Sequence, residues 1–535
     1  MDVSELVRSR VIKSLIMKLT DNRKLAVLMI SHLLWGLVLW FSISKYGLGI
    51  STDSVHLLFG ASNFSAGRGL ISFDRSFLSI WPPLYPLLLA LVHRASGLSV
   101  FISANVLQLL AFIGLSLCLS LLFLKIFPDN FLLAFAGNLF SDIGVVVLIS
   151  FNIVGPDYVH LAFVVFFIWL AGTYLEHGSP RIFVIMFVVG MLAMLQRYLG
   201  LAVIATGAIT VLFFSEGAYL QRITRSLLLS LSGLPAGLWL LITSRSIERR
   251  APISFPENFS WFSKSILEWF FPSESVKAYF GFYIACLWIF LIGLIVWLFL
   301  SSSRVQQFST YSIPVFIYGI SYTLLLFGSA SVTYFNKLGG RFLLPLYIPF
   351  VMLITMAVGV LLRRYSENGE RSSFLPRLVS VSSIGVLAII AGLLLQVTLP
   401  VVFESRANGA AGGENVFNTM KWHENEAIKY WLSHRPQGKY LLFSNYSDGV
   451  AFYTGHACFG SPRQYSGPYG TEEFPVSQYA SELFSSGQDV YVIWIEPNEY
   501  SYFYKVEDLS SIAQVEPLFV SKDGGVYRLK PISGS

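Results

Sequence analysis

A succession of long apolar runs constrains this chain more than any other feature of its sequence. A helix that crosses a bilayer needs about 20 mostly apolar residues, because the hydrocarbon core is about 30 Å thick. Of the 535 residues, 54% are hydrophobic and 13% are charged, roughly half the charged share of an average soluble domain. The sequence therefore predicts a mainly α, polytopic membrane protein. The apolar runs lie at residues 25–47, 80–95, 100–124, 131–151, 158–175, 182–195, 198–214, 224–243, 279–300, 311–328, 342–362 and 378–399.

Basic residues set the expected orientation of these runs. Six Lys and Arg residues precede the first run, and positive flanks mark the cytoplasmic side of a membrane. This run lacks a small-residue cleavage site, so we interpret it as an uncleaved anchor. The loop at 363–377 carries four arginines and is also expected to be cytoplasmic. The N-terminus is then inside, the chain after residue 400 is outside, and the number of crossings is odd.

The run "WPPLYPLLLALVHRASG", at 81–97, is the one that we expect not to cross. It is short, begins with two prolines and has Pro86 one turn later. Proline removes a backbone donor, and a lipid-exposed span needs every backbone group to be paired within the helix. We expect a helix at the outer surface, which leaves about eleven spans.

The remaining organisation follows from this topology. Residues 1–24 form a cytoplasmic N-terminus, and 25–399 form a membrane domain with a first outer loop at 48–98. Residues 400–535 are predicted to form a small extracytoplasmic α/β domain. Its expected strands are "KYLLFSN", "DVYVIWIEP" and "GGVYRLKP", and its expected helix is "ENEAIKYWLSH".

Several kinds of site are disfavoured. The three cysteines and the scattered histidines lack the spacing of a zinc or redox site, so we assign no metal ligands. No Gly-rich phosphate loop lies between a strand and a helix, which argues against a nucleotide-sugar donor. We expect no nucleic-acid partner.

Charged residues collect at the predicted outer ends of the spans. Asp53 follows the first span in "LGISTDSVHLL", and Asp157 opens a later one in "GPDYVHLAF". Three cations lie at the same boundary: Arg197, beside Tyr198 in "QRYLG", and Lys337 and Arg341 in "NKLGGRFLLP". Charge at a membrane boundary is costly unless it is paired or functional.

Each of these residues also has a purely structural interpretation. Thr52 or Asp53 could cap an amphipathic helix, and Asp157 could cap the helix that it opens. Arg197 and Arg341 could be interfacial anchors whose side chains reach the headgroups. Asp142, inside the third predicted span, could be a buried polar contact or could approach the site.

Read in order, "STDSVHLLFGASNFSAGRGLISF", "WPPLYPLLLALVHRASGL", "GPDYVHLAF", "LQRYLGLAVI" and "GGRFLLPLYIPF" resemble the membrane glycosyltransferases of the GT-C fold. The resemblance is closest to the bacterial branch similar to protein mannosyltransferases and lipid A aminoarabinose transferase. It covers about residues 25–400, and the aspartate followed by "PPLYP" in the first outer loop is its most specific part.

The resemblance implies a transferase that takes a hexosyl or pentosyl group from a polyprenyl-phosphate donor on the non-cytoplasmic face of the cell's inner (plasma) membrane. It implies that Asp53 is the catalytic carboxylate, and that Asp157, which matches the family's second acidic position, is a second catalytic residue. The acceptor is expected to be a lipid, a glycan or a protein. Many relatives have a paired Asp-Glu where this chain has Asp53-Ser54, so a divalent metal is an option that the resemblance leaves open.

The chemistry of such a donor agrees with these residue types. A phosphate leaving group needs no general acid, so the site requires one base and one or more cations. Asp53 suits the base, and Arg341, Arg197 and Lys337 suit the phosphate, which guanidinium groups grip through parallel hydrogen bonds.

Four further residues are expected to line the substrate site. These are His56, Trp81, Tyr85 and Tyr198. Trp81 and Tyr85 could instead be interfacial anchors, and His56 an ordinary surface residue. The alternative function is a polytopic lipid or glycan transporter without transferase chemistry. Such a protein would favour charge at the bilayer midplane and paired repeats, which the sequence does not show.

Overall fold

A computed structural model describes residues 3–243, 253–300, 310–332, 338–367, 374–410, 416–465, 472–498 and 500–532. Its contacts divide the chain into two compact units. The helical unit comprises Met1–Ser44, Ser79–Tyr85 and Asn105–Arg406, and the sheet unit comprises Lys45–Leu78, Pro86–Ala104 and Ala407–Ser535. The sheet unit therefore combines the C-terminal residues with most of the first outer loop, which was predicted to belong to the membrane domain. Its C-terminal part begins at Ala407, near the boundary predicted at residue 400.

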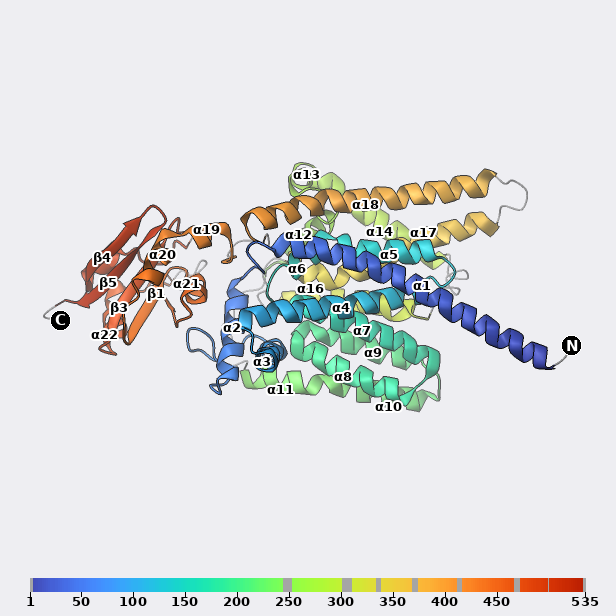
Figure 1. The fold of residues 1–535 in the computed structure, drawn as a ribbon, viewed down its shortest axis with the longest axis horizontal. Helices are drawn as coiled ribbons and strands as arrows, with labels where there is room; N and C mark the ends of the chain where they lie inside the picture. The colour runs from blue at the N-terminus through green and yellow to red at the C-terminus, as the bar shows by residue number, and fades with distance from the viewer. Residues whose placement is uncertain are drawn as a thin grey trace. The chain divides into compact units, whose positions relative to one another are not determined.

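The helical unit is built from long helices with short connections. Figure 1 shows several of their axes running roughly parallel, and α1 packs on α5, α5 on α17, and α7 on α8 and α9. Its helices are α1 (Val3–Ile43), α4 (Val100–Ile126), α5 (Phe131–Ile143), α6 (Val145–Phe151), α7 (Pro156–His177), α8 (Pro180–Gln196), α9 (Leu201–Phe214), α10 (Tyr219–Ser230), α11 (Leu234–Thr243), α12 (Phe255–Leu267), α13 (Ser273–Ala278), α14 (Phe280–Leu300), α16 (Ser312–Val332), α17 (Leu344–Glu367) and α18 (Phe374–Asn408), with 3-10 turns η1 (Tyr198–Gly200), η2 (Leu231–Gly233) and η4 (Gly340–Leu343).

Seven helices of the described ranges are long and apolar enough to span a membrane, or eight if α5 and α6, which meet at an angle of 52°, form one bent span. The predicted multi-pass membrane protein is thus confirmed. Three shorter apolar helices, Pro180–Gln196, Tyr198–Phe214 and Phe280–Ile289, would bring the total to the predicted eleven. These three helices are shorter than a typical span, so helix length supports seven or eight crossings directly.

Gly144 stands between α5 and α6 with an extended backbone, at the bend of the two helices. A Cβ atom built there would lie 2.4 Å from the ring of Tyr347 on α17. The Tyr347 hydroxyl in turn donates to the carbonyl of Phe140, 2.7 Å away. Only glycine allows the ring to pack this closely at the break.

The sheet unit contains a five-stranded mixed sheet in the order β2-β1-β3-β5-β4. The strands are β1 (Tyr440–Ser444), β2 (Phe459–Gly460), β3 (Asp489–Ile495), β4 (Ala513–Ser521) and β5 (Gly524–Pro531). Its helices and 3-10 turns are α2 (Thr52–Ser65), α3 (Leu84–Ser96, whose first two residues belong to the helical unit), α19 (Met420–Glu424), α20 (Glu426–Ser433), α21 (Ser447–Thr454), α22 (Tyr479–Phe484), η5 (Val476–Gln478) and η6 (Glu507–Ser511).

The three strands and the helix predicted in the C-terminal region are confirmed as β1, β3, β5 and α20. β3 is buried at every position after Asp489, as its unbroken run "VYVIWI" requires. Its side chains Val490, Val492 and Trp494 enter one hydrophobic core together with Leu529 of β5.

The three strands β2, β1 and β3 are mutually parallel, so their carboxyl ends meet at one edge of the sheet. From β1 the chain continues to β2 on one side, whereas β3 lies on the other side of β1 and continues toward β4 and β5. Connections that lead away from two neighbouring strands in opposite directions leave a crevice at that edge.

Candidate active site

Asp53 lies in the first turn of α2, but it is not the residue that caps this helix. Ser51 is the N-cap, and its hydroxyl accepts a hydrogen bond from the Ser54 amide at 3.3 Å. The Ser54 hydroxyl accepts one from the Ser51 amide at 3.0 Å. This reciprocal capping box satisfies the helix start without the Asp53 carboxylate.

His56 follows one turn later on the same helix and is held by the rest of the first outer loop. Its ring packs against Phe73 with a centroid distance of 4.8 Å, and its Nδ1 shares a hydrogen bond of 2.5 Å with the Ser72 hydroxyl. Its orientation is therefore set by contacts within the sheet unit.

A further carboxylate, which the sequence analysis did not select, lies close to these residues. Asp448 lies in the first turn of α21, and α21 packs on α2. Burial raises the pKa of Asp448, the charge of His56 lowers it, and the carboxylates of Asp74 and Asp53 raise it further. His56, Asp74 and Asp448 line one pocket, and Asp53 acts on Asp448 from the same helix as His56, so these side chains form one cluster. The sequence feature that could have indicated Asp448 is the polar segment "SNYSDG" at the end of a buried strand.

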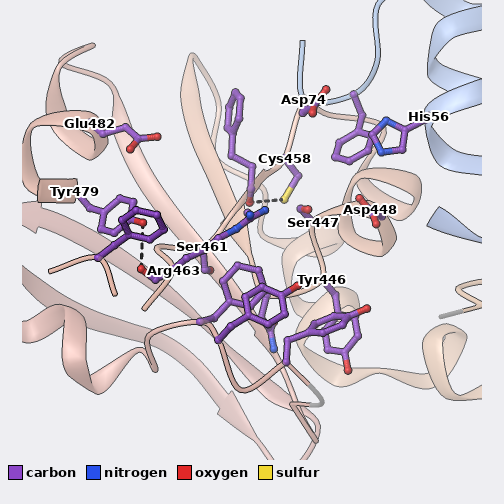
Figure 2. Close-up of a pocket in the computed structure, with 18 of the residues that line it drawn as sticks. His56, Asp74, Tyr446, Ser447, Asp448, Cys458, Ser461, Arg463, Tyr479 and Glu482 are labelled. Carbon is purple, nitrogen blue, oxygen red and sulfur yellow. Dashed lines mark hydrogen bonds between the residues drawn. The ribbon is translucent and has the colours of Figure 1, made fainter. Parts of the chain in front are cut away.

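This cluster borders a pocket of about 610 Å³ within the sheet unit. Figure 2 shows His56, Asp74 and Asp448 at one side of it, and Tyr479 and Glu482 at the other. A volume of this size is typical of small-molecule sites.

In the helical unit, Asp157 forms an ion pair with Arg197. Asp157 is the second residue of α7, whose N-cap, Gly155, offers no side-chain acceptor. The residue is 8% exposed, and the Arg197 side chain is 14% exposed. The structure thus joins a predicted carboxylate to a predicted phosphate ligand 40 positions later.

Arg341 approaches the same place from η4, the 3-10 turn that precedes α17. The guanidinium of Arg197 lies 5.6 Å from the ring centre of Phe342, and that of Arg341 lies 5.7 Å from it. The two predicted phosphate ligands therefore share one aromatic ring. The Phe342 carbonyl accepts a hydrogen bond of 2.8 Å from Tyr322 of α16, which anchors this turn. Lys337, the third predicted cation, lies outside the described residues.

The "RYLG" turn keeps Arg197 in place. Arg197 ends α8, and Tyr198 begins the 3-10 turn η1 that leads into α9. A Cβ atom on Gly200 would lie 2.3 Å from the backbone oxygen of Ala193. Glycine at the end of this motif therefore allows α8 and the turn to touch through their backbones.

The other predicted positions lie within the helical unit. The Trp81 carbonyl accepts a hydrogen bond of 3.3 Å from the Trp239 indole of α11, and Tyr85 is 1% exposed. Asp142 pairs with the ring of His32 on α1 at 2.7 Å, and the other ring nitrogen of His32 contacts Asn138 at 2.9 Å. Asp142 is thus a buried, paired group among the helices.

The described residues do not supply a metal-ligand set. Within the described ranges, no three His, Cys, Asp or Glu side chains come close enough together to hold one ion. The acidic cluster around Asp448 therefore does not fit a divalent metal as it stands.

Comparisons with known proteins show which fold this architecture has. No protein-family model matches the chain, and no curated protein matches its sequence. Among solved structures, ArnT from Cupriavidus metallidurans in the apo state superposes with a TM-score of 0.56 at 10% identity, covering 94% of this chain and 97% of that one. The chain has the GT-C fold.

Two further structures support this assignment. ArnT from the same organism bound to undecaprenyl phosphate has a TM-score of 0.56 at 11% identity, with 94% and 98% of the two chains covered. The apo oligosaccharyltransferase of Archaeoglobus fulgidus has a TM-score of 0.55 at 13% identity, with 96% and 75% covered. The GT-C resemblance seen in the sequence, including its likeness to the aminoarabinose transferase, is confirmed. At these identities the likeness establishes the fold.

Proposed function

We propose that this chain is a membrane glycosyltransferase that moves one hexosyl or pentosyl group from a polyprenyl-phosphate donor to an acceptor hydroxyl. It would act on the non-cytoplasmic face of the inner (plasma) membrane. The observation that carries the proposal is a GT-C fold over 94% of the chain, with an aspartate at the start of the first-loop helix that is not needed as its cap. The undecaprenyl phosphate bound to ArnT indicates the class of lipid.

In the proposed reaction the acceptor oxygen attacks the anomeric carbon of the donor sugar. The bond from that carbon to the phosphate oxygen breaks, and its electron pair leaves with the polyprenyl phosphate. The acceptor proton passes to the Asp53 carboxylate, which acts as the general base. Because the leaving phosphate is already stable as an anion, no acid is required at that oxygen.

The leaving phosphate would be bound at the ring of Phe342. We assign the phosphate to Arg341 and Arg197, whose guanidinium groups both lie beside this ring, and Asp157 balances the charge of Arg197. Lys337, outside the described residues, stays a predicted third ligand. In this assignment Asp157 acts through Arg197 as a positioning residue. A guanidinium grips two phosphate oxygens at once, which suits the leaving group better than a point charge.

The experiment that tests this proposal is transfer of radiolabelled sugar from a panel of polyprenyl-phosphate donors to the lipids and proteins of membranes containing the chain. Asp53→Asn should lower the rate by 10²–10⁴-fold, the usual contribution of a general base. The matched control is Asp129→Asn, the same change at an exposed position between α4 and α5, and it should leave the rate unchanged.

Normal transfer by Asp53→Asn, at equal protein level, would refute the assigned base. If the wild type transfers no sugar from any donor but moves labelled lipid between leaflets, the transporter alternative replaces the enzyme.

A further inference from the structure

The pocket in the sheet unit occupies the place where α/β sheets bind ligands. Its walls come from the segments that follow the three parallel strands: Asp448 after β1, Ser461 and Arg463 after β2, and Tyr500 and Tyr502 after β3. β1 and β3 are neighbours whose onward connections run in opposite directions. Open α/β sheets bind ligands at the carboxyl ends of strands at such a switch point.

Aromatic rings cover one part of the pocket. Tyr446 and Tyr500 have ring centroids 4.8 Å apart, and Tyr502 and Phe503 have centroids 4.5 Å apart. The Arg463 guanidinium lies 5.9 Å from the rings of both Tyr502 and Phe503. These rings hold one another in place, so the surface that they present to a ligand is preorganised.

Polar side chains line the remainder of the pocket, and the hydroxyl of one of them has no hydrogen-bond partner among the described residues. Ser461 is 2% exposed, and its hydroxyl has no hydrogen-bond partner among the described residues. Its backbone amide is bonded to the Ser444 carbonyl at 2.9 Å, so the residue itself is fixed. A buried hydroxyl without a partner is unfavourable, and a ligand hydroxyl in the pocket would satisfy it.

We infer that this pocket binds a sugar ring of a glycan acceptor, with its apolar C–H face on the tyrosines and its hydroxyls on Asp448 and Ser461. This inference rests on the proposed function, whose acceptor it specifies. Aromatic faces beside carboxylates and hydroxyls suit a ring that has one apolar face and a rim of hydroxyls.

The charges of the pocket specify the sugar further. Among the described residues that line it, Asp74, Asp448 and Glu482 carry carboxylates and Arg463 carries a guanidinium. This balance favours neutral and amino sugars and opposes acidic ones. The pocket suits an extended peptide less well, because its edge strand β2 has two residues and so offers few backbone groups for strand addition.

The test is saturation-transfer NMR on the full chain in lipid nanodiscs. The probes are methyl β-glucoside, methyl β-glucosaminide, methyl β-glucuronide and a serine-containing hexapeptide. The first two should bind and the glucuronide should not. Ser461→Ala should weaken glucoside binding three- to tenfold without loss of stability, because the hydroxyl has no partner to lose among the described residues. Tyr502→Ala should weaken it by more than tenfold.

The control variant is Tyr430→Ala, since Tyr430 of α20 stacks on Phe519, outside the pocket, and binding should not change. Equal glucoside binding by wild type and Ser461→Ala and Tyr502→Ala would overturn the inference. So would binding of the peptide alone, which would assign the pocket to a protein acceptor.

The Arg341→Ala variant separates this inference from the proposed function. Arg341 belongs to the helical unit and does not line the pocket, so this variant should bind methyl β-glucoside as the wild type does while its rate of sugar transfer falls. If the wild type transfers sugar but binds no glycoside, the inferred sugar pocket is refuted and the proposed enzyme stands. If the wild type binds glycoside but transfers no sugar from any donor, the proposed transferase activity is refuted and the sugar pocket stands.

Discussion

The first turns of α2 and α7 place an aspartate at the same helical position, but the N-cap and the contacts of the aspartate differ between the two helices. α2 begins with a serine capping box, and its second residue, Asp53, is partly exposed. α7 begins with Gly155, which has no capping side chain, and its second residue, Asp157, is buried against Arg197.

This difference separates two uses of a carboxylate. At α7 the charge is neutralised by an arginine that reaches back from the end of α8, so the pair fixes the geometry between two helices. At α2 the serines form the cap, and the Asp53 carboxylate acts on the nearby carboxyl of Asp448, as that of Asp74 does. Position in a helix therefore does not decide the surroundings of a carboxylate, whereas the residues that pack against it do.

The largest effect on stability is expected from breaking the pair at α7. Asp157→Asn should lower the free energy of unfolding by about 3–5 kcal/mol, because it leaves the Arg197 charge buried without its counter-charge. The measurement is thermal unfolding of the purified protein in detergent. The double variant Asp157→Leu/Arg197→Met removes both charges and should recover much of the loss. An Asp157→Asn protein as stable as the wild type would contradict this comparison.

A smaller effect is expected at the capping box of α2. Ser51→Ala should lower the free energy of unfolding by about 1 kcal/mol, the usual value of an N-cap side chain. Ser51→Asn keeps a capping oxygen and should restore most of it. Asp53→Asn should lower the free energy of unfolding less than Ser51→Ala does in the same assay, because Ser51 and Ser54 supply the cap. If it destabilises the protein as much as Ser51→Ala does, Asp53 contributes to the cap after all.

The smallest effect is a pH dependence at Asp448. Because burial raises the pKa of this carboxyl above its unfolded value near 3.8, the folded state holds the proton more tightly. The contribution of Asp448 to stability is therefore most favourable below pH 4 and is lost as the pH rises through the raised pKa. Asp448→Asn should raise Tm slightly at pH 7 and leave it unchanged below pH 4.

Glu516 provides a control of opposite sign for this measurement. The hydrogen bond and charge of Lys530 lower its pKa, so its favourable contribution is present above the ordinary carboxyl pKa and is lost in acid. Glu516→Gln should lower Tm slightly at pH 7. The interpretation of Asp448 fails if Asp448→Asn and Glu516→Gln shift Tm in the same direction at pH 7.

Local patterns in the sequence predicted much of the fold. Unbroken apolar runs gave the membrane spans, and "VYVIWI" predicted a strand buried on both faces, because both patterns depend only on neighbouring residues. Two strands were missed for local reasons as well. β2 has two residues, too few to show a period, and β4 carries Pro517 in the middle of "AQVEPLFVS".

The pairings that define the candidate sites could not be predicted in this way. Asp157 and Arg197 are 40 positions apart, His32 and Asp142 are 110 apart, and Asp448 joins a cluster whose other members precede residue 75. Nothing in a local pattern specifies which distant charges will meet, since that depends on how the helices and strands pack.

The sequence by itself determined that this chain crosses a membrane many times, that it ends in an α/β region and that its outer segments resemble those of GT-C enzymes. These properties follow from hydrophobic periodicity and from short motifs, which are local. Only the tertiary structure decided that Ser51 caps α2, that Arg197 and Arg341 share the ring of Phe342, and that a pocket lies at the ends of three parallel strands. Those features arise from contacts between segments far apart in the chain, which packing alone brings together.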